Sequence, residues 1–136
     1  MKVLLVEDDD VLAAQLRHVI RAMDGAELVH AAVNDEDACD WMAANPEGWD
    51  LALVDVFLAG GHGFKVLRQC AGRSPGQRVV LMSSYTRDPM RQRALEAGAD
   101  AFFDKTEPER LIDFCIDVLK SRRMASAQDK GDRSDR

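Results

Sequence analysis

The feature that most limits the fold of this chain is a regular alternation between short apolar runs and amphipathic stretches. The five apolar runs lie at residues 2–7, 26–33, 51–58, 78–84 and 100–105. Each is followed by a stretch whose apolar residues are spaced three or four apart, which is typical of a helix with one buried face. The sequence therefore predicts five strands that alternate with five helices.

Local signals indicate where the first two helices begin and end. Asp9 or Asp10 can cap the first helix, which we expect to end at Gly25. Asn34 is a suitable cap for the second helix, which stops before Pro46 because proline cannot continue a helix.

The later helices carry similar signals. The segment GGHGF reads as the turn that opens the third helix, and Asp88 followed by Pro89 predicts the start of a fourth that ends at Gly98. Thr106, with Glu109 three residues later, predicts a capping box at the start of the last helix.

Together these elements predict the fold class. Apolar strands joined through helices favour an α/β fold with a parallel sheet covered on both faces, and the connections are right-handed. A chain of 136 residues fits one domain of ordinary size. In an open sheet of this kind, ligands bind beyond the carboxyl ends of the strands.

Charge is unevenly distributed along the chain. Residues 1–119 hold 12 Lys/Arg and 21 Asp/Glu, a net charge of −9, whereas residues 120–136 have a net charge of +3. An acidic body is a poor match for direct binding of nucleic acid. The polar end cannot form a core, so we expect a folded domain at 1–121 and a disordered tail at 122–136.

The chain shows no sign of a membrane partner or of export. No run approaches the ~20 apolar residues of a membrane-spanning helix, and no signal peptide is recognisable. Cys39, Cys70 and Cys115 form no CxxC pair, which argues against a zinc knuckle or a redox dithiol. We interpret each as a small core residue in a reducing compartment, which favours a cytoplasmic location.

Polar side chains gather at the carboxyl ends of four predicted strands. In chain order they are Glu7, Asp8, Asp55, Ser83 and Lys105. Three neighbouring carboxylates raise one another's pKa unless a cation relieves their repulsion. Mg²⁺ is commonly held by one or two carboxylates together with water and phosphate oxygens. The sequence therefore predicts a Mg²⁺ site at this edge of the sheet.

These residues lie in four segments, LLVEDD, LALVDVFLAGGHG, LMSS and FFDK, whose order resembles the receiver domain of two-component response regulators. The resemblance covers residues 2–120. It implies a flavodoxin-like sheet with strand order 2-1-3-4-5. It also implies that Asp55 accepts a phosphoryl group from a sensor histidine kinase or a phosphotransfer protein. Such a domain catalyses at most its own phosphorylation and dephosphorylation.

The resemblance assigns roles around the phosphoacceptor. Asp8 and Asp55 would bind Mg²⁺ directly, together with the backbone carbonyl of Phe57. Glu7 would reach the metal mostly through water. Lys105 would pair with an oxygen of the phosphoryl group.

The resemblance also implies a switch. Ser83 would donate its hydroxyl to another phosphoryl oxygen and draw the following loop inward, and Phe102 would move into the vacated space. The affected face, built by the fourth helix, fifth strand and fifth helix, would bind an unknown downstream protein or a second copy. We further hypothesise that Phe57 and Tyr85 border the pocket and limit the access of water.

Three positions depart from the family's usual residues. Thr106 stands where the residue after the lysine is commonly proline, Phe102 where the switch residue is often tyrosine, and Ala59 where the loop usually has proline. Without a hydroxyl, the two states of Phe102 would differ by packing alone.

Several alternatives remain open at this stage. The chain could be the N-terminal receiver of a longer regulator, for example a DNA-binding one, with the tail as a linker. It could also be a degenerate receiver that is never phosphorylated. A Mg²⁺-dependent phosphatase with an aspartyl nucleophile would need a second acid two residues after Asp55, and Phe57 stands there.

Overall fold

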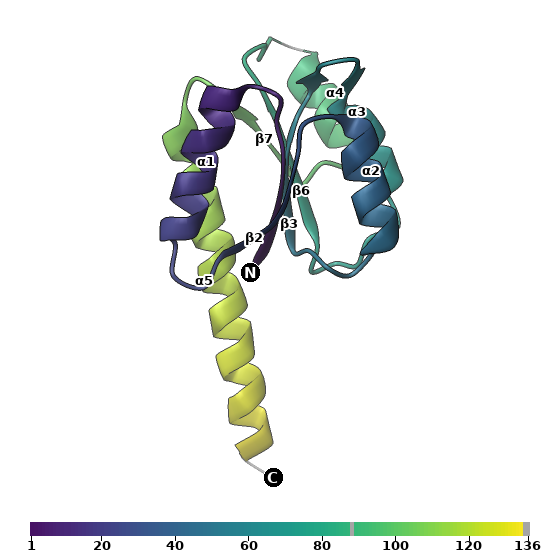
Figure 1. Ribbon diagram of the computed structural model, residues 1–136. Coiled ribbons are helices and arrows are strands. Elements are labelled where there is room, and N and C mark those ends of the chain that lie inside the picture. Colours follow the sequence, from purple (N-terminus) through teal and green to yellow (C-terminus); the bar gives the residue numbers. More distant parts are fainter. Residues whose placement is uncertain (88, 135–136) are drawn as a thin grey trace.

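A five-stranded parallel sheet runs through the centre of the molecule (Figure 1). The computed structural model describes residues 1–87 and 89–134, with side chains described as far as Ala127. The strands of this sheet are β1 (Lys2–Val6), β2 (Glu27–Ala32), β3 (Leu51–Asp55), β6 (Arg78–Ser83) and β7 (Ala101–Asp104). Their order, β2-β1-β3-β6-β7, confirms the predicted order 2-1-3-4-5, because β6 and β7 are the fourth and fifth strands of the sheet.

Helices cover both faces of the sheet, as the alternation predicts. They are α1 (Asp10–Ala22), α2 (Asp35–Ala44), α3 (Gly63–Gln69), α4 (Met90–Glu96) and α5 (Pro108–Ser134). In Figure 1, α1 and α5 lie on one side of the sheet and α2, α3 and α4 on the other. A short antiparallel hairpin, β4 (Phe57–Leu58) and β5 (Gly61–His62), follows β3 where the sequence predicts only a loop.

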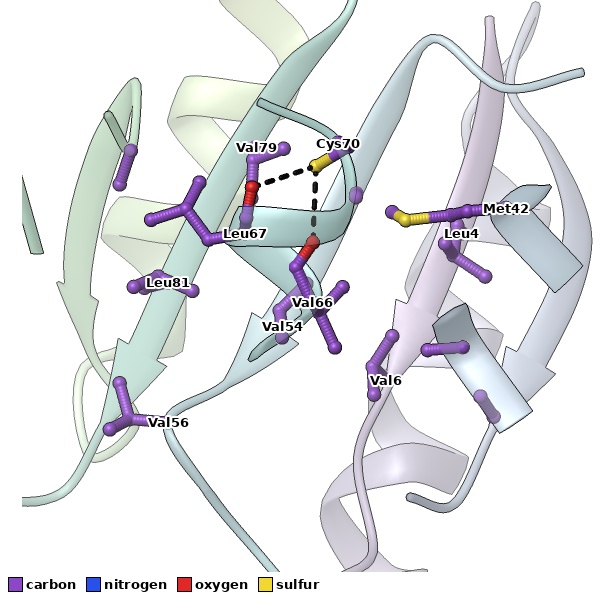
Figure 2. Close-up of a cluster of buried hydrophobic side chains, with 14 of the residues drawn as sticks. Leu4, Val6, Met42, Val54, Val56, Val66, Leu67, Cys70, Val79 and Leu81 are labelled. Carbon is purple, nitrogen blue, oxygen red and sulfur yellow. Dashed lines mark hydrogen bonds between the residues drawn. The ribbon is translucent and has the colours of Figure 1, made fainter. Parts of the chain in front are cut away.

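The core consists of two apolar clusters separated by the sheet. Leu4 and Val6 of β1 lie in the cluster under α2, α3 and α4 (Figure 2), whereas Val3 and Leu5 lie in the cluster under α1 and α5. Full burial of such side chains contributes roughly 1.5–3 kcal/mol each. Because a slip of one residue would exchange the two clusters, this burial fixes the register in which the strand ends meet.

Two helices begin at the caps that the sequence predicts. The Asp9 carboxylate accepts hydrogen bonds from the backbone N–H groups of Val11 and Leu12, at 2.9 and 3.0 Å. The Asn34 side chain accepts one from the N–H of Asp37 at 2.8 Å. These bonds satisfy amide groups that have no partner within the helix, so they stabilise the first turn.

Two other helix starts differ from the prediction. Pro89 occupies the cap position of α4 rather than its first helical position, and Asp88 lies outside the described residues. The Thr106 hydroxyl donates to the Asp104 carboxylate at 2.7 Å instead of capping α5. The Asp104 carboxylate also accepts from the Thr106 N–H, and because α5 begins at Pro108, Thr106 lies one residue before the cap position.

Helix α5 continues to Ser134, through most of the range for which the sequence predicts a disordered tail. Lys, Arg, Met, Ala and Gln dominate the segment from residue 120 to 128, and these residues favour a helix even without packing. The end of α5 extends beyond the sheet in Figure 1, and residues 124–127 are exposed. The domain boundary at residue 121 stays a prediction.

Cysteines behave mainly as packing residues. Cys70 and Cys115 are buried, Cys39 is partly exposed, and all three carry free thiols. Burial raises the pKa of Cys115 to about 12, so this thiol is un-ionised at neutral pH. Within the described residues, no helix combines the length and apolar character that a membrane span requires.

Candidate functional site

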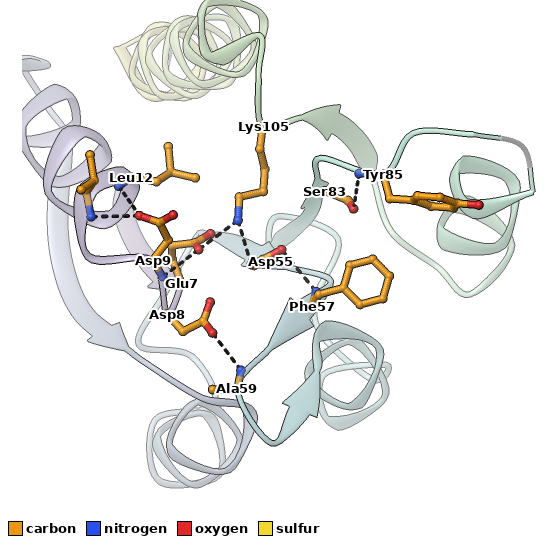
Figure 3. Close-up of polar contacts among 11 residues, drawn as sticks. Glu7, Asp8, Asp9, Leu12, Asp55, Phe57, Ala59, Ser83, Tyr85 and Lys105 are labelled. Carbon is orange, nitrogen blue, oxygen red and sulfur yellow. Dashed lines mark hydrogen bonds and ion pairs between the residues drawn. The ribbon is translucent and has the colours of Figure 1, made fainter.

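Three carboxylates meet at the edge of the sheet where the neighbouring strands β1 and β3 end (Figure 3). Glu7 and Asp8 directly follow β1, and Asp55 is the last residue of β3. One carboxylate oxygen from each of the three lies within 4.8 Å of the others. Glu7 and Asp55 are each only 2% exposed, so their charges have little access to solvent.

Lys105 provides the positive charge that this cluster contacts. It follows β7 directly, and its Nζ donates to Asp55 Oδ2 at 2.9 Å and to Glu7 Oε1 at 3.0 Å. One ammonium group therefore faces three carboxylates, two of which are buried. Charge-assisted hydrogen bonds of this kind offset part of the desolvation of the carboxylates but leave the cluster with an excess of negative charge.

Burial and pairing act in opposite directions on the ionisation of this cluster. Burial raises the pKa of Glu7 to about 7, and the nearby Asp55 adds to the rise, although Lys105 and the N–H of Asp9 oppose it. For Lys105, burial favours the neutral amine, yet its hydrogen bonds to Asp55 and Glu7 raise its pKa overall. The lysine is therefore charged at neutral pH, whereas Glu7 is close to its titration point.

The donor set suits a hard divalent cation. Oxygen ligands from one or two carboxylates, completed by water and phosphate oxygens, are what Mg²⁺ prefers. Within the described residues, Glu7 Oε2 is a buried oxygen with no hydrogen-bond partner, which a cation or its water would satisfy. The residues present therefore fit the predicted Mg²⁺ site. The participation of the Phe57 carbonyl stays a prediction.

The loop beyond Asp55 is held close to the site by backbone contacts. Gly63 N–H donates to the carbonyl of Val56 at 2.8 Å, and a Cβ at Gly63 would overlap the carbonyl oxygen of Asp55. The N–H of Ala59 donates to Asp8 Oδ2 at 2.9 Å. The backbone amide of Ala59 therefore helps to orient the Asp8 carboxylate.

The β4–β5 hairpin is anchored by an acid that the sequence analysis did not single out. Asp35, the first residue of α2, is buried and accepts from the N–H of His62 at 3.2 Å. A Cβ at Gly61 would overlap this carboxylate. The glycine-rich segment is thus explained by two close approaches, at Gly61 and at Gly63.

An open cleft of about 330 Å³ lies over the carboxylates, lined by Asp8, Asp9, Asp55, Phe57, Ser84 and Lys105. Ser84 was not among the predicted site residues, and its position beside Ser83 in the LMSS segment is the only signal for it. Ser83 is fully buried, and its Oγ accepts from the N–H of Tyr85 at 2.9 Å. Its hydroxyl is therefore engaged within the loop.

Phe57 and Tyr85, the two aromatic residues predicted to border the pocket, differ in their position relative to the cleft. Phe57 lines the cleft and is 56% exposed. Tyr85 is not among the residues that line the cleft, and in Figure 3 its ring points away from Asp55. Its place at the border of the pocket stays a prediction.

Phe102, the predicted switch residue, is buried in β7 and only 3% exposed. Its carbonyl accepts from Arg91 at 3.2 Å, and the Arg91 guanidinium lies 6.0 Å from the centre of its ring. Both residues line a small cavity of about 200 Å³ on the face formed by α4, β7 and α5.

Comparison with known proteins agrees with this arrangement. The sequence model of the family described as response regulator receiver domain matches residues 3–115. The chain is 26% identical over 124 residues to the response regulator UvrY of Escherichia coli O6:H1, covering 90% of this chain and 56% of that protein. It is 32% identical over 106 residues to the DNA-binding transcriptional activator DevR/DosR of Mycobacterium tuberculosis, covering 77% of this chain and 48% of that one.

A solved structure shows the same fold. A two-component response regulator of the LuxR family from Aurantimonas sp. SI85-9A1 superposes with a TM-score of 0.76 at 21% identity, covering 88% of this chain and 85% of that one. At this identity the likeness concerns the fold alone. The chain spans about half the length of the two curated relatives described above.

Proposed function

The chain belongs to the response regulator receiver domain family, and from this premise we propose that it is a phosphorylation-dependent switch with Asp55 as the phosphoacceptor. The donor would be a phosphohistidine on a sensor histidine kinase or on a phosphotransfer protein. The observation that carries the proposal is the contact of Asp55 with Lys105, 2.9 Å apart, on the floor of an open cleft beside two more carboxylates. A cytoplasmic location fits the three free thiols.

The proposed reaction is a transfer between two nucleophiles. A carboxylate oxygen of Asp55 forms a bond to phosphorus while the bond from phosphorus to the histidine nitrogen breaks, and that electron pair returns to the imidazole ring. The product is a mixed anhydride that water can later hydrolyse, which returns the switch to its resting state.

The residues around Asp55 have separate tasks in this proposal. Asp8, Asp55 and Glu7 would hold Mg²⁺, which supplies charge neutralisation when a phosphoryl group approaches the acidic cluster. Lys105 already donates to Asp55 and would transfer a hydrogen bond to a phosphoryl oxygen. Ser84 lines the cleft and is placed to accept or donate at its rim.

The switch itself would begin at the end of β6. Ser84 lines the cleft, so its hydroxyl is placed to donate to a phosphoryl oxygen, whereas Ser83, the predicted donor, is fully buried with its Oγ accepting from the N–H of Tyr85. Such a bond would draw the loop after β6 inward and change the packing around Phe102 and Arg91. The face of α4, β7 and α5 would then bind a downstream protein or a second phosphorylated copy.

A second candidate keeps the same chemistry in a different setting. The curated relatives continue beyond the matched region, and one of them is a DNA-binding activator. In that candidate residues 1–121 are the receiver of a longer regulator, and α5 beyond residue 121 links it to an effector. The sequence of the complete gene would decide between the two candidates.

Phosphorylation can be tested with a small phosphodonor. Purified protein is incubated with Mg²⁺ and acetyl phosphate, and intact mass is measured for the native chain, for Asp55→Asn and for Asp24→Asn, an exposed control. We expect one added phosphoryl group on the native chain and on the control only. Addition to Asp55→Asn would show a different acceptor, and no addition to the native chain with Mg²⁺ bound would favour a degenerate receiver.

A further inference from the structure

Charge is segregated between two parts of the receiver domain. Residues 1–62 contain 13 Asp/Glu and three Lys/Arg, whereas residues 63–97 contain two Asp/Glu and seven Lys/Arg. The second segment comprises α3, β6 and α4. Four of the seven cations, Lys65, Arg68, Arg91 and Arg93, lie at exposed positions on α3 and α4. An acidic molecule therefore has a basic region on these two helices.

A groove of about 510 Å³ opens in that region between the β4–β5 hairpin, α3 and α4. Apolar atoms of Phe57, Phe64 and Met90 line it. Arg68 of α3 and Arg93 of α4 stand at the same groove, and both are exposed. The groove thus combines an apolar floor with two cations from two different helices.

The apolar part of this groove is unusual for a surface. Phe57 is 56% exposed, although full burial of such a side chain is worth roughly 1.5–3 kcal/mol. Within the described residues, neither Arg68 nor Arg93 takes part in an ion pair. An aromatic side chain and two arginines are the residue types that contribute most to binding at protein interfaces.

We propose that the groove between α3, α4 and the β4–β5 hairpin is a docking site for an acidic segment of a partner protein that carries one apolar anchor. The anchor fills the space over Phe57, Phe64 and Met90, and carboxylates on either side pair with Arg68 and Arg93. The groove shares α4 with the face of α4, β7 and α5 but opens toward α3 and the β4–β5 hairpin, and binding in it does not require phosphorylation of Asp55.

The chemistry of the groove favours a protein segment over other anions. A nucleic acid backbone offers phosphates but no apolar side chain to cover Phe57, and the net charge of −6 repels a long polyanion. An anionic membrane would be repelled by the same net charge. A short acidic peptide with an apolar centre would contact only the basic region of the groove and would be repelled less by the acidic remainder of the molecule.

The probe for the test is a fluorescein-labelled peptide of about eight residues, with a Leu-Phe pair flanked by Glu and Asp, titrated by anisotropy at about 50 mM salt. The variants are Arg68→Glu with Arg93→Glu, and a control, Arg21→Glu with Lys120→Glu, which changes the net charge equally at exposed positions on the opposite side of the sheet. Circular dichroism checks that both variants fold. Two further peptides replace the acids by Lys or the anchor by Ser-Ser.

We expect the groove variant to weaken binding of the acidic peptide at least about tenfold and the control variant less than about threefold. The Lys peptide and the Ser-Ser peptide should bind weakly to the native protein, and amide resonances of Phe57, Phe64 and Met90 should shift on addition of the acidic peptide. Equal weakening in both variants, shifts confined to other faces, or no binding of the acidic peptide at about 1 mM would overturn the proposal. So would tighter binding of DNA or of anionic vesicles at the same arginines.

Discussion

At the scale of single residues, Glu7 is the group whose ionisation the fold changes most clearly. Burial raises its pKa to about 7 from 4.5, so between these values the folded protein binds more protons than the unfolded chain. Without added metal, the free energy of unfolding should therefore decrease as pH rises from about 4.5 to about 7, by on the order of 3 kcal/mol. Above that window the loss is complete.

The check is urea unfolding at about pH 5 and about pH 8 in the presence of EDTA. The native protein should lose stability over this interval, and Glu7→Gln should lose clearly less, because its side chain does not ionise. Lys105 stays charged throughout, so it adds no slope. An equal loss in the native protein and in Glu7→Gln would show that groups other than Glu7 cause the dependence.

Phe57 is the second residue for which we make a prediction. It concerns the rate of dephosphorylation and depends on the proposed phosphorylation of Asp55. The Phe57 side chain lines the cleft, where under the proposal it would limit the approach of water to a phosphoryl group on Asp55. Replacement Phe57→Asn should accelerate dephosphorylation at least about threefold, a change of ~0.6 kcal/mol in the barrier. Tyr85→Ala should change the rate less, since its ring points away from Asp55.

The measurement is the loss of the phosphoryl group over time after the phosphodonor is removed. The single variants and the double variant Phe57→Asn with Tyr85→Ala are compared with the native chain. An unchanged rate in the double variant would refute the idea that these aromatics limit access of water.

At this scale, the site residues that could be predicted from the sequence are those at the carboxyl ends of strands. Glu7, Asp8, Asp55 and Lys105 could be placed together because the carboxyl ends of parallel strands share one edge of the sheet. Ser84 could not be separated from Ser83, since only the twist of the loop decides which hydroxyl faces the cleft.

At the scale of elements, the loop between β3 and α3 depends on backbone approach. A Cβ at Gly63 would overlap the carbonyl oxygen of Asp55, so Gly63→Ala should lower the free energy of unfolding by roughly 1–3 kcal/mol. Because the overlap is with the phosphoacceptor's own backbone, phosphorylation by acetyl phosphate should slow as well.

Gly72 provides the matched control. A Cβ there meets no atom within 4 Å, so Gly72→Ala should change stability by less than about 0.5–1 kcal/mol and leave phosphorylation unchanged. Urea unfolding and the rate of phosphoryl addition are measured for both variants. If Gly63→Ala were as stable and as reactive as Gly72→Ala, the close approach would have no structural consequence.

Strands and helices with strong periodicity were predictable, whereas the shortest elements were not. The β4–β5 hairpin has two residues in each strand, too few to show any alternation. Its anchor, Asp35, lies near it only through packing of α2, which is distant in sequence. The capping box at Thr106 did not form because α5 begins at Pro108, one residue later than the box requires.

At the scale of the whole molecule, α5 extends beyond the sheet it covers. Arg122 pairs with Asp50 at 2.9 Å, but residues 124–127 are exposed. Removal of residues 124–136 should therefore change the free energy of unfolding by less than about 0.5 kcal/mol. Arg122→Ala in the full chain serves as a comparison for loss of a contact with the body.

Urea unfolding of the shortened chain tests the proposed domain boundary. A loss of several kcal/mol would mean that the end of the helix belongs to the folded domain. The conformation of the segment after residue 121 could not be predicted from the sequence. Its residues have high helix propensity, which favours a helix, but it has no apolar face to pack, which favours disorder.

Charge and topology at this scale connect the cleft with the proposed docking groove, because Phe57 lines both. Its N–H donates to Asp55 Oδ1 at 3.2 Å. A group bound at Asp55 would therefore change the surroundings of a residue that also lines the groove. With Mg²⁺ bound in both states, phosphorylation replaces a carboxylate by an acyl phosphate that carries about one more negative charge, which disfavours a neighbouring acidic segment. We therefore expect the acidic peptide to bind about fivefold less tightly to the phosphorylated protein, a coupling of ~1 kcal/mol.

The affinity of the peptide is measured with Mg²⁺ alone and with Mg²⁺ and acetyl phosphate, for the native chain and for Asp55→Asn. Only the native chain should show the change, since only it can be phosphorylated under the proposal. By linkage the peptide must then disfavour the phosphorylated state to the same degree. Unchanged binding to phosphorylated protein would separate the two sites, and tighter binding would contradict the charge argument. A change that persisted in Asp55→Asn would arise from the phosphodonor rather than from the switch.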